Sequence, residues 1–370
     1  MGDDTVTGDV TNAHDRLLPL TPVSQPSEWY RRRIARRTPG ASGALPRHRP
    51  LTAAELSAAG VTRTQRRDNY VRVESGVYVH VTSLTAGASP RERLRTVPAA
   101  TLVRAHHRRH PAHIATGFAA GAMLGMRYLV DDAPLEFLVT RGAGCSNPAA
   151  HLSLTRTRRH DQLFHTATHP DPAFPTLACT TAGYTLGRMI RTLHEPDPGV
   201  ALQWAVPDLR RILPQLSPAF IRSVQASDCF HQALRRTVPG SLESLVQTRT
   251  VDASLAAGVL GATDPGAESP PETVLRLAVA DLAPGLQSQV PVWRDNGSLL
   301  TAADMGWHDR GVHLFYDGEH HLKRSQRDHD SEVLAHLQRD GGHVLRVTAG
   351  NLRDADSVEE LRERVRDALR

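Results

Sequence analysis

The chain has 370 residues, a formal net charge of +5, a pI near 9.5 and 40% apolar residues. This length suits two or three domains, and the apolar fraction excludes a largely disordered protein. The modest positive charge favours an anionic partner such as nucleic acid. The N-terminus is polar, and no apolar run approaches the roughly 20 residues that a membrane-spanning helix needs. We therefore expect a cytoplasmic protein with no membrane partner.

Cysteine and lysine are both rare. The three cysteines, Cys145, Cys179 and Cys229, are widely spaced, and no Cys-x-x-Cys motif is present. This excludes a zinc-finger or redox motif and predicts free thiols in a reducing compartment. Lys323 is the sole lysine among 44 basic residues, a bias typical of a GC-rich genome.

Residues 1–48 are predicted to form a disordered, basic tail. They contain several prolines and an arginine-rich run from Tyr30 to Arg37. The run suits non-specific contact with phosphates. A solvated tail or a short surface helix explains the same residues.

Residues 49–85 are predicted to form a winged helix. Thr52 and Glu55 have the spacing of a capping box, and Thr62 is placed to cap a second short helix. Two alternating strands then flank the turn at Gly76. In a winged helix the second helix enters the DNA groove, and here that helix carries the basic residues Arg63, Arg66 and Arg67.

This segment, from Leu51 to Val79, resembles the N-terminal winged-helix domain of AbiEi-like antitoxins, which precedes nuclease-like domains in many actinobacterial proteins. The resemblance implies DNA binding through Arg63, Arg66 and Arg67, and a toxin-like protein as a further partner. The second helix departs from the family because it has almost no apolar residue to pack it down. A small structural wing that contacts protein therefore remains an alternative.

Residues 86–195 are expected to form an α/β domain that resembles the middle domain of the same antitoxin-like proteins. It begins with an apolar helix from Leu94 to Arg104. A histidine cluster follows, and we expect a solvated helix end there rather than a metal site; its members are His106, His107, His110 and His113. Residues 196–262, broken by prolines, are expected to form a helical connector.

Residues 263–370 are predicted to run helix, three-stranded meander, helix, strand, helix. Ser269 and Pro270 are placed to open the first helix, and the last helix has a capping box of Ser357 and Glu360. This is the core order of the restriction-endonuclease-like, or PD-(D/E)xK, fold. The fold class expected for the whole chain is thus α/β (α+β) and multidomain.

The C-terminal segment resembles the very-short-patch-repair (Vsr-like) endonuclease domain. The matching pieces follow the family in order: Ser269-Pro270-Pro271-Glu272 with Arg276, Gln289-Val290, Ala303-Asp304, Tyr316-Asp317-Gly318 with His321, and residues 344–348. The resemblance implies a Mg²⁺ site held by Asp304 and Asp317. It also implies proton transfer by His321 and an orienting role for Glu272.

Simpler roles exist for the same residues. Glu272 completes a Ser-x-x-Glu capping box, Asp304 suits the solvent face of an alternating strand, and Asp317-Gly318 is ordinary turn chemistry. The family usually has a glutamate two residues before the aspartate, where this chain has Phe315. Gly342 stands where the family usually has a tryptophan before the last core strand.

Two functions therefore remain open. The first is a DNA-binding protein with a metal-dependent endonuclease-like domain that hydrolyses a DNA phosphodiester with Mg²⁺. The second is a catalytically inactive nuclease fold that acts as an antitoxin-like DNA-binding regulator, which the loss of the acid at Phe315 favours. A scaffold that binds no nucleic acid is a third hypothesis, and it requires the arginines to be dispersed.

Overall fold

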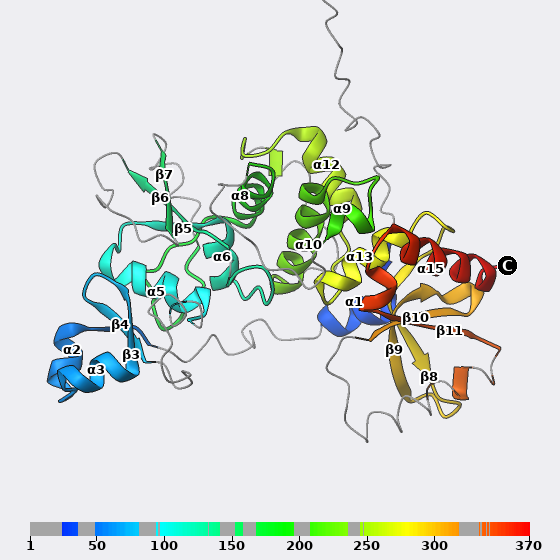
Figure 1. Cartoon of the computed structure of the whole chain (residues 1–370), viewed down its shortest axis with the longest axis horizontal. Coiled ribbons are helices and arrows are strands. Elements are labelled where there is room, and N and C mark those ends of the chain that lie inside the picture. The colour runs from blue at the N-terminus through cyan, green and yellow to red at the C-terminus, as the bar shows by residue number, and fades with distance from the viewer. Residues whose placement is uncertain are drawn as a thin grey trace, which may run out of the picture.

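The computed structural model describes residues 24–35, 49–80, 94, 97–131, 133–140, 152–157, 168–195, 208–235, 245–246, 248–317, 333, 335–337, 339 and 341–370. These residues form three sheets with helices around them, which confirms the α/β multidomain class (Figure 1). None of the helices in these ranges has the length and apolar character needed to cross a membrane.

The N-terminal sheet and its two helices have the order expected of a winged helix. Its elements are β2 (Leu51–Thr52), α2 (Ala53–Ala58), α3 (Arg63–Asn69), β3 (Tyr70–Glu74) and β4 (Val77–His80). The strands lie in the order β2-β4-β3 and are antiparallel. Both helices begin at a capping box, Thr52 with Glu55 and Thr62 with Gln65, so the expected capping is confirmed.

This unit shares its core with the domain that follows it. The buried valines of β3 and β4 belong to the same apolar cluster as Val97, Ala99 and Val103 at the start of α5 (Ala99–Arg109). Arg108 of α5 donates to the carboxylate of Glu55 over 2.8 Å. The expected helix from Leu94 to Arg104 begins instead at Ala99, because Pro98 is its N-cap.

The middle sheet mixes strand directions. Its elements are β5 (Ile114–Thr116), α6 (Gly117–Met123), β6 (Leu135–Thr140), β7 (Leu152–Thr157) and α8 (Ala182–His194). β5 and β6 are antiparallel, whereas β6 and β7 are parallel. α6 and α8 pack closely because Gly121 has no side chain: a Cβ there would lie 2.5 Å from a methyl carbon of Met189. Cys179, between β7 and α8, is a buried free thiol.

Between residues 208 and 262, the described part of the chain contains α9 (Leu209–Ile212), α10 (Pro218–Ala233) and α12 (Ala253–Ala262). α10 belongs to two cores at once. Its first turn places Ile221 in the core of the C-terminal domain, and its later turns place Phe230 in the core of the middle domain. The segment expected to be a connector is thus part of the cores on both sides of it.

The C-terminal domain is built on a five-stranded sheet, to which the N-terminal segment adds one strand, with α13 and α15 on one face. Its elements are α13 (Pro270–Val279), β8 (Gln287–Trp293), β9 (Leu299–Trp307), the 3₁₀ turn His308–Arg310, β10 (Val312–Asp317), β11 (His343–Thr348), the 3₁₀ turn Ala349–Leu352 and α15 (Ala355–Ala368). β8, β9 and β10 form an antiparallel meander, and β11 is parallel to β10. Apolar side chains of α13 and α15 cover Met305, Leu314 and Val347 of the sheet. The N-cap of α15 is Asp354 rather than the expected Ser357, because the carboxylate of Asp354 accepts the backbone N–H of Ser357.

Part of the segment predicted to be a disordered tail is folded. Residues 24–35 form β1 (Gln25–Pro26), which pairs in parallel with β8, and α1 (Glu28–Ala35), which packs on β8. In Figure 1 this blue segment lies beside the orange and red elements of the C-terminal domain. Tyr30 and Ile34, four residues apart on one face of α1, are buried, so the helix docks by an apolar stripe that the arginines obscure in the sequence.

A buried polar network joins these parts. Arg276 of α13 and Asp228 of α10 are both fully buried, and their side chains lie 2.8 Å apart. Thr273 donates to the same carboxylate, and the backbone N–H of Asp264 donates to its other oxygen. Arg276 also donates to Ser24, at the edge of β1. Burial raises the pKa of Asp228 to about 7, and the Arg276 guanidinium opposes that rise.

Removing one partner of this pair leaves an uncompensated buried charge. We predict that Arg276→Met lowers the free energy of unfolding by about 3–5 kcal/mol at pH 8, where Asp228 is ionised. The matched control is Arg339→Gln, which breaks an exposed pair with Asp295 and costs less than about 1 kcal/mol. Urea unfolding of the full chain measures both. Equal losses in the two variants would contradict the importance of burial.

Candidate functional site

Asp304 lies where the ladder between β9 and β10 ends and the ladder between β9 and β8 skips one pair. On the β10 side, strand pairing ends at Leu314–Met305, and the Asp304 carboxylate accepts the backbone N–H of Tyr316 over 2.6 Å. On the β8 side, the register has no pair between Asp304 and Gln289. The half-buried carboxylate therefore occupies a gap in the sheet, and the expectation that Asp304 is a solvent-facing strand residue does not describe its setting.

Gln289, opposite Asp304, has an unusual backbone. Its φ is +52°, in the left-handed region that non-glycine residues rarely adopt. The Gln289 carbonyl accepts a hydrogen bond from the Ser27 hydroxyl, and the Ser27 N–H donates to Ser288. A backbone conformation of this kind costs on the order of 1–3 kcal/mol and is held by its surroundings. The N-terminal segment thus supports the strained strand beside Asp304.

Glu272 is the second acid of the site. It lies in the first turn of α13 and is buried, with one oxygen accepting the Ser269 hydroxyl and the other accepting the backbone N–H of Glu268. Ser269 is the N-cap and Pro270 follows it, as expected, but the Ser269 side chain does not cap the helix, so the expected capping box is not formed. Burial, and then the nearby charge of Asp304, raise the pKa of Glu272 well above its usual value.

The pairing of two acids suits a divalent cation. The largest cause of the raised Glu272 pKa is burial, and the second is repulsion from the charge of Asp304. A bound cation would offset that repulsion. Mg²⁺ takes one or two protein carboxylates and completes its shell with water and substrate phosphates. Asp304 and Glu272 fit that ligand set.

Asp317 has a different partner. It lies at the end of β10, and its carboxylate is 3.6 Å from the guanidinium of Arg346 on β11. A metal site would require carboxylate oxygens of Asp304, Asp317 and Glu272 to lie close together. Within the described residues, these three do not all have oxygens within 4.8 Å of one another. His321, Gly318 and Lys323 lie outside the described residues.

Phe315 belongs to an apolar cluster. It packs with Val292, Leu300, Val333 and Leu337. Phe315, which replaces the family's glutamate, therefore packs against the sheet and supplies no metal ligand.

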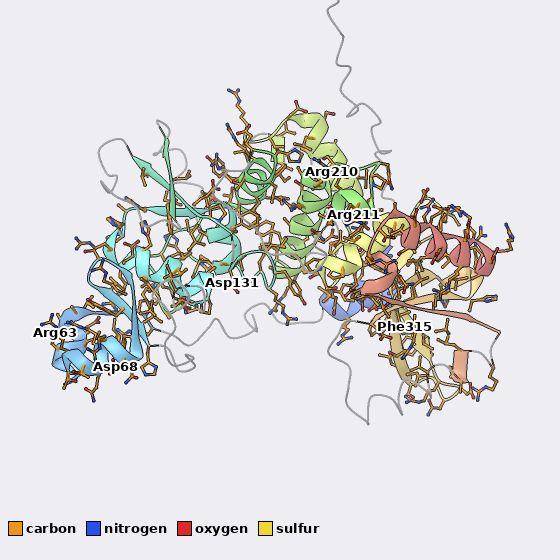
Figure 2. All side chains as sticks on the ribbon, in the orientation of Figure 1. Arg63, Asp68, Asp131, Arg210, Arg211 and Phe315 are labelled. Carbon is orange, nitrogen blue, oxygen red and sulfur yellow. The ribbon has the colours of Figure 1, made fainter. Side chains whose placement is uncertain are left out.

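The predicted DNA-binding residues lie on an exposed helix. None of the α3 residues is buried, and Arg63 and Arg67 are exposed. The guanidinium of Arg66 lies over the Tyr78 ring, 5.2 Å from its centroid, and Arg67 pairs with Asp68. Figure 2 shows Arg63 and Asp68 at one end of the molecule and Phe315 near the other.

A groove beside α1 was not predicted from the sequence. It has a volume of about 800 Å³ and lies between α1 and β8. Its lining combines basic and aromatic side chains: Trp29, Arg31, Arg32, Arg33, Trp293 and His308. The arginine run was visible in the sequence, but its docking on the C-terminal sheet depends on the buried stripe of Tyr30 and Ile34.

A search against models of known protein families gives no match, and a search of curated protein sequences gives none either. Among solved structures, the chain is similar to the crystal structure of the Rv2827c protein from Mycobacterium tuberculosis. The alignment covers 62% of this chain and 85% of the other, with 16% sequence identity and a TM-score of 0.28. A likeness at this level assigns no function.

The raised pKa of Glu272 has a consequence for stability. Because the folded-state pKa of Glu272 lies above its unfolded value of 4.5, the contribution of Glu272 to stability is fully present below that value and is lost as pH rises through the folded-state pKa. We predict that Glu272→Gln is more stable than wild type at pH 8 and that this gain disappears at pH 4. Thermal or urea unfolding at both pH values measures it. A variant less stable than wild type at pH 8 would contradict the repulsion between the two acids.

Proposed function

We propose that this chain is a DNA-binding protein whose C-terminal domain hydrolyses a DNA phosphodiester with Mg²⁺. Two observations carry the proposal: the Asp304 carboxylate lies at a gap in the sheet, and its charge acts on the buried carboxyl of Glu272. The Vsr-like resemblance of the same segment supports it. A cytoplasmic location and a toxin-like partner belong to the proposal as well.

In this proposal Asp304 and Glu272 hold the cation. A bound Mg²⁺ supplies charge stabilisation at the phosphate and lowers the pKa of the attacking water. The hydrogen bond from Tyr316 fixes the Asp304 carboxylate, and those from Ser269 and Glu268 fix Glu272. His321 is the residue proposed to move the proton, by resemblance.

DNA binding is supported by two basic surfaces. The first is α3, whose residues are exposed and include Arg63, Arg66 and Arg67. The second is the groove beside α1, where arginines lie near the exposed ring of Trp293. Arginine guanidinium groups bind phosphate oxygens, and the net charge of +5 has the sign that such contacts require.

A second function, an inactive nuclease fold that regulates by binding DNA, is favoured by two specific contacts. Phe315 is packed in an apolar cluster, so one negative charge of the family site is absent. Arg346 lies beside Asp317 and places a positive charge where the family site would hold a cation. Both functions require DNA binding, and they differ in whether the Asp304–Glu272 pair cleaves.

Cleavage is tested by plasmid nicking with Mg²⁺ or Mn²⁺. We predict that wild type nicks and that Asp304→Asn reduces the rate at least about 100-fold, because a metal ligand is lost. Asparagine retains an oxygen that can accept the Tyr316 N–H, so the fold is preserved. The matched control is Asp309→Asn, an exposed acid in the turn between β9 and β10, which leaves the rate unchanged.

Nicking that survives Asp304→Asn would place the activity elsewhere and contradict the assignment of this site. Wild-type protein that binds DNA without nicking it would support the regulator instead.

DNA binding is tested by the dependence of affinity on salt. Each phosphate contact adds roughly 0.9 to the slope of log K against log salt. We predict that changing Arg63, Arg66 and Arg67 to glutamine lowers that slope by about 2–3. The control is Arg210→Gln with Arg211→Gln, two exposed arginines on α9, labelled in Figure 2, which leave the slope unchanged.

An equal fall in both variants would mean diffuse attraction rather than a binding helix. Wild-type protein that binds no DNA at low salt would instead favour a scaffold.

A further inference from the structure

The histidine cluster expected to lie on a solvated helix end is buried. His106, His107 and His113 are each less than 10% exposed. His107 points to Thr176, whereas His106 and His113 face the hairpin of β3 and β4 through Glu74. The cluster therefore lies at the junction between the winged-helix unit and the middle domain.

Three side chains at this junction have the arrangement of metal ligands. Glu74 is the last residue of β3, and His106 and His110 lie one helical turn apart at the end of α5. A carboxylate oxygen of Glu74 and one ring nitrogen of each histidine all lie within 4.8 Å of one another. In a tetrahedral Zn²⁺ site such atoms are about 3.4 Å apart, so modest side-chain rotations close the site.

His106 is oriented from both sides. Its Nδ1 lies 2.8 Å from the Glu74 carboxylate, and its Nε2 lies 3.0 Å from Nδ1 of His113. The ring is fully buried and also lies against Phe137. A metal-bound histidine normally donates its second N–H to a fixed acceptor, and His113 is such an acceptor.

We propose that Glu74, His106 and His110 bind a divalent transition-metal ion of the Zn²⁺ class. His106 binds through Nδ1, and its Nε2–H donates to His113. In the metal-bound form the neutral imidazole of His106 carries its single proton on Nε2, which leaves Nδ1 free to bind the ion. Two imidazoles and a carboxylate suit Zn²⁺, whereas Mg²⁺ prefers an all-oxygen set, so this site is chemically distinct from Asp304 and Glu272.

The bound ion would join two structural units. Glu74 belongs to the hairpin that follows α3, whereas the histidines belong to α5 of the middle domain. The ion would therefore fix the position of the winged helix on the middle domain. This inference goes beyond the proposed function and does not depend on cleavage or on DNA binding.

The test is Zn²⁺ binding to the full chain after chelator treatment, followed by calorimetry and by the visible spectrum of the Co²⁺-loaded protein. Wild type is expected to bind one tight ion per chain, to show the intense d–d bands of a tetrahedral site, and to gain thermal stability. Glu74→Gln with His110→Gln is expected to lose that ion, its bands and the added stability. The matched control, His169→Ala, removes an exposed histidine outside the cluster and is expected to behave as wild type.

Both variant positions are partly exposed, and glutamine replaces each side chain without creating a large cavity, so the apo fold is retained; circular dichroism checks it. Absence of tight binding by wild type would overturn the proposal. Equal binding by the Glu74→Gln, His110→Gln protein would also overturn it, since the ion would then lie on other histidines.

Discussion

The buried ion pair of Asp228 and Arg276 is the contact on which the arrangement of the C-terminal half depends. It ties α10 to α13, and through Asp264 and Ser24 it reaches the turn before α13 and the N-terminal segment. A buried charge without a partner costs several kcal/mol. Any movement of α10 relative to α13 that separated the pair would therefore destabilise both helices. The same α13 that carries Arg276 carries Glu272 one turn earlier, on which the candidate site depends.

The site itself combines features that reduce stability. Glu272 is buried within the field of the Asp304 charge, and Gln289 has a left-handed backbone opposite Asp304. Local strain and repulsion of this kind are typical of functional sites, where the surrounding structure maintains them. Here that support comes from Ser27 on the Gln289 carbonyl and from Ser269 on the Glu272 carboxylate. The N-terminal segment is therefore part of the site's framework.

Local signals in the sequence predicted much of the fold. The capping box at Thr52, the cap at Thr62 and the Ser269-Pro270 helix start depend on neighbouring residues, and their prediction from the sequence is confirmed. Contacts between distant residues were not: the pairing of β1 with β8 joins residues more than 250 positions apart, and no local pattern encodes it. The same holds for the site. Resemblance to the Vsr-like domain indicates Glu272 and Asp304, but the Arg346 contact of Asp317 and the burial of the histidines depend on tertiary packing.

The central claim is that Asp304 and Glu272 share a divalent cation, and the ionisation of Glu272 tests it most directly. Carboxyl ¹³C shifts of glutamate-labelled protein, followed against pH with and without Mg²⁺, report that ionisation. A raised Glu272 pKa without Mg²⁺ that falls when Mg²⁺ is added is the predicted result, and Asp304→Asn should abolish the Mg²⁺ effect. A Glu272 pKa that Mg²⁺ leaves unchanged would contradict the account.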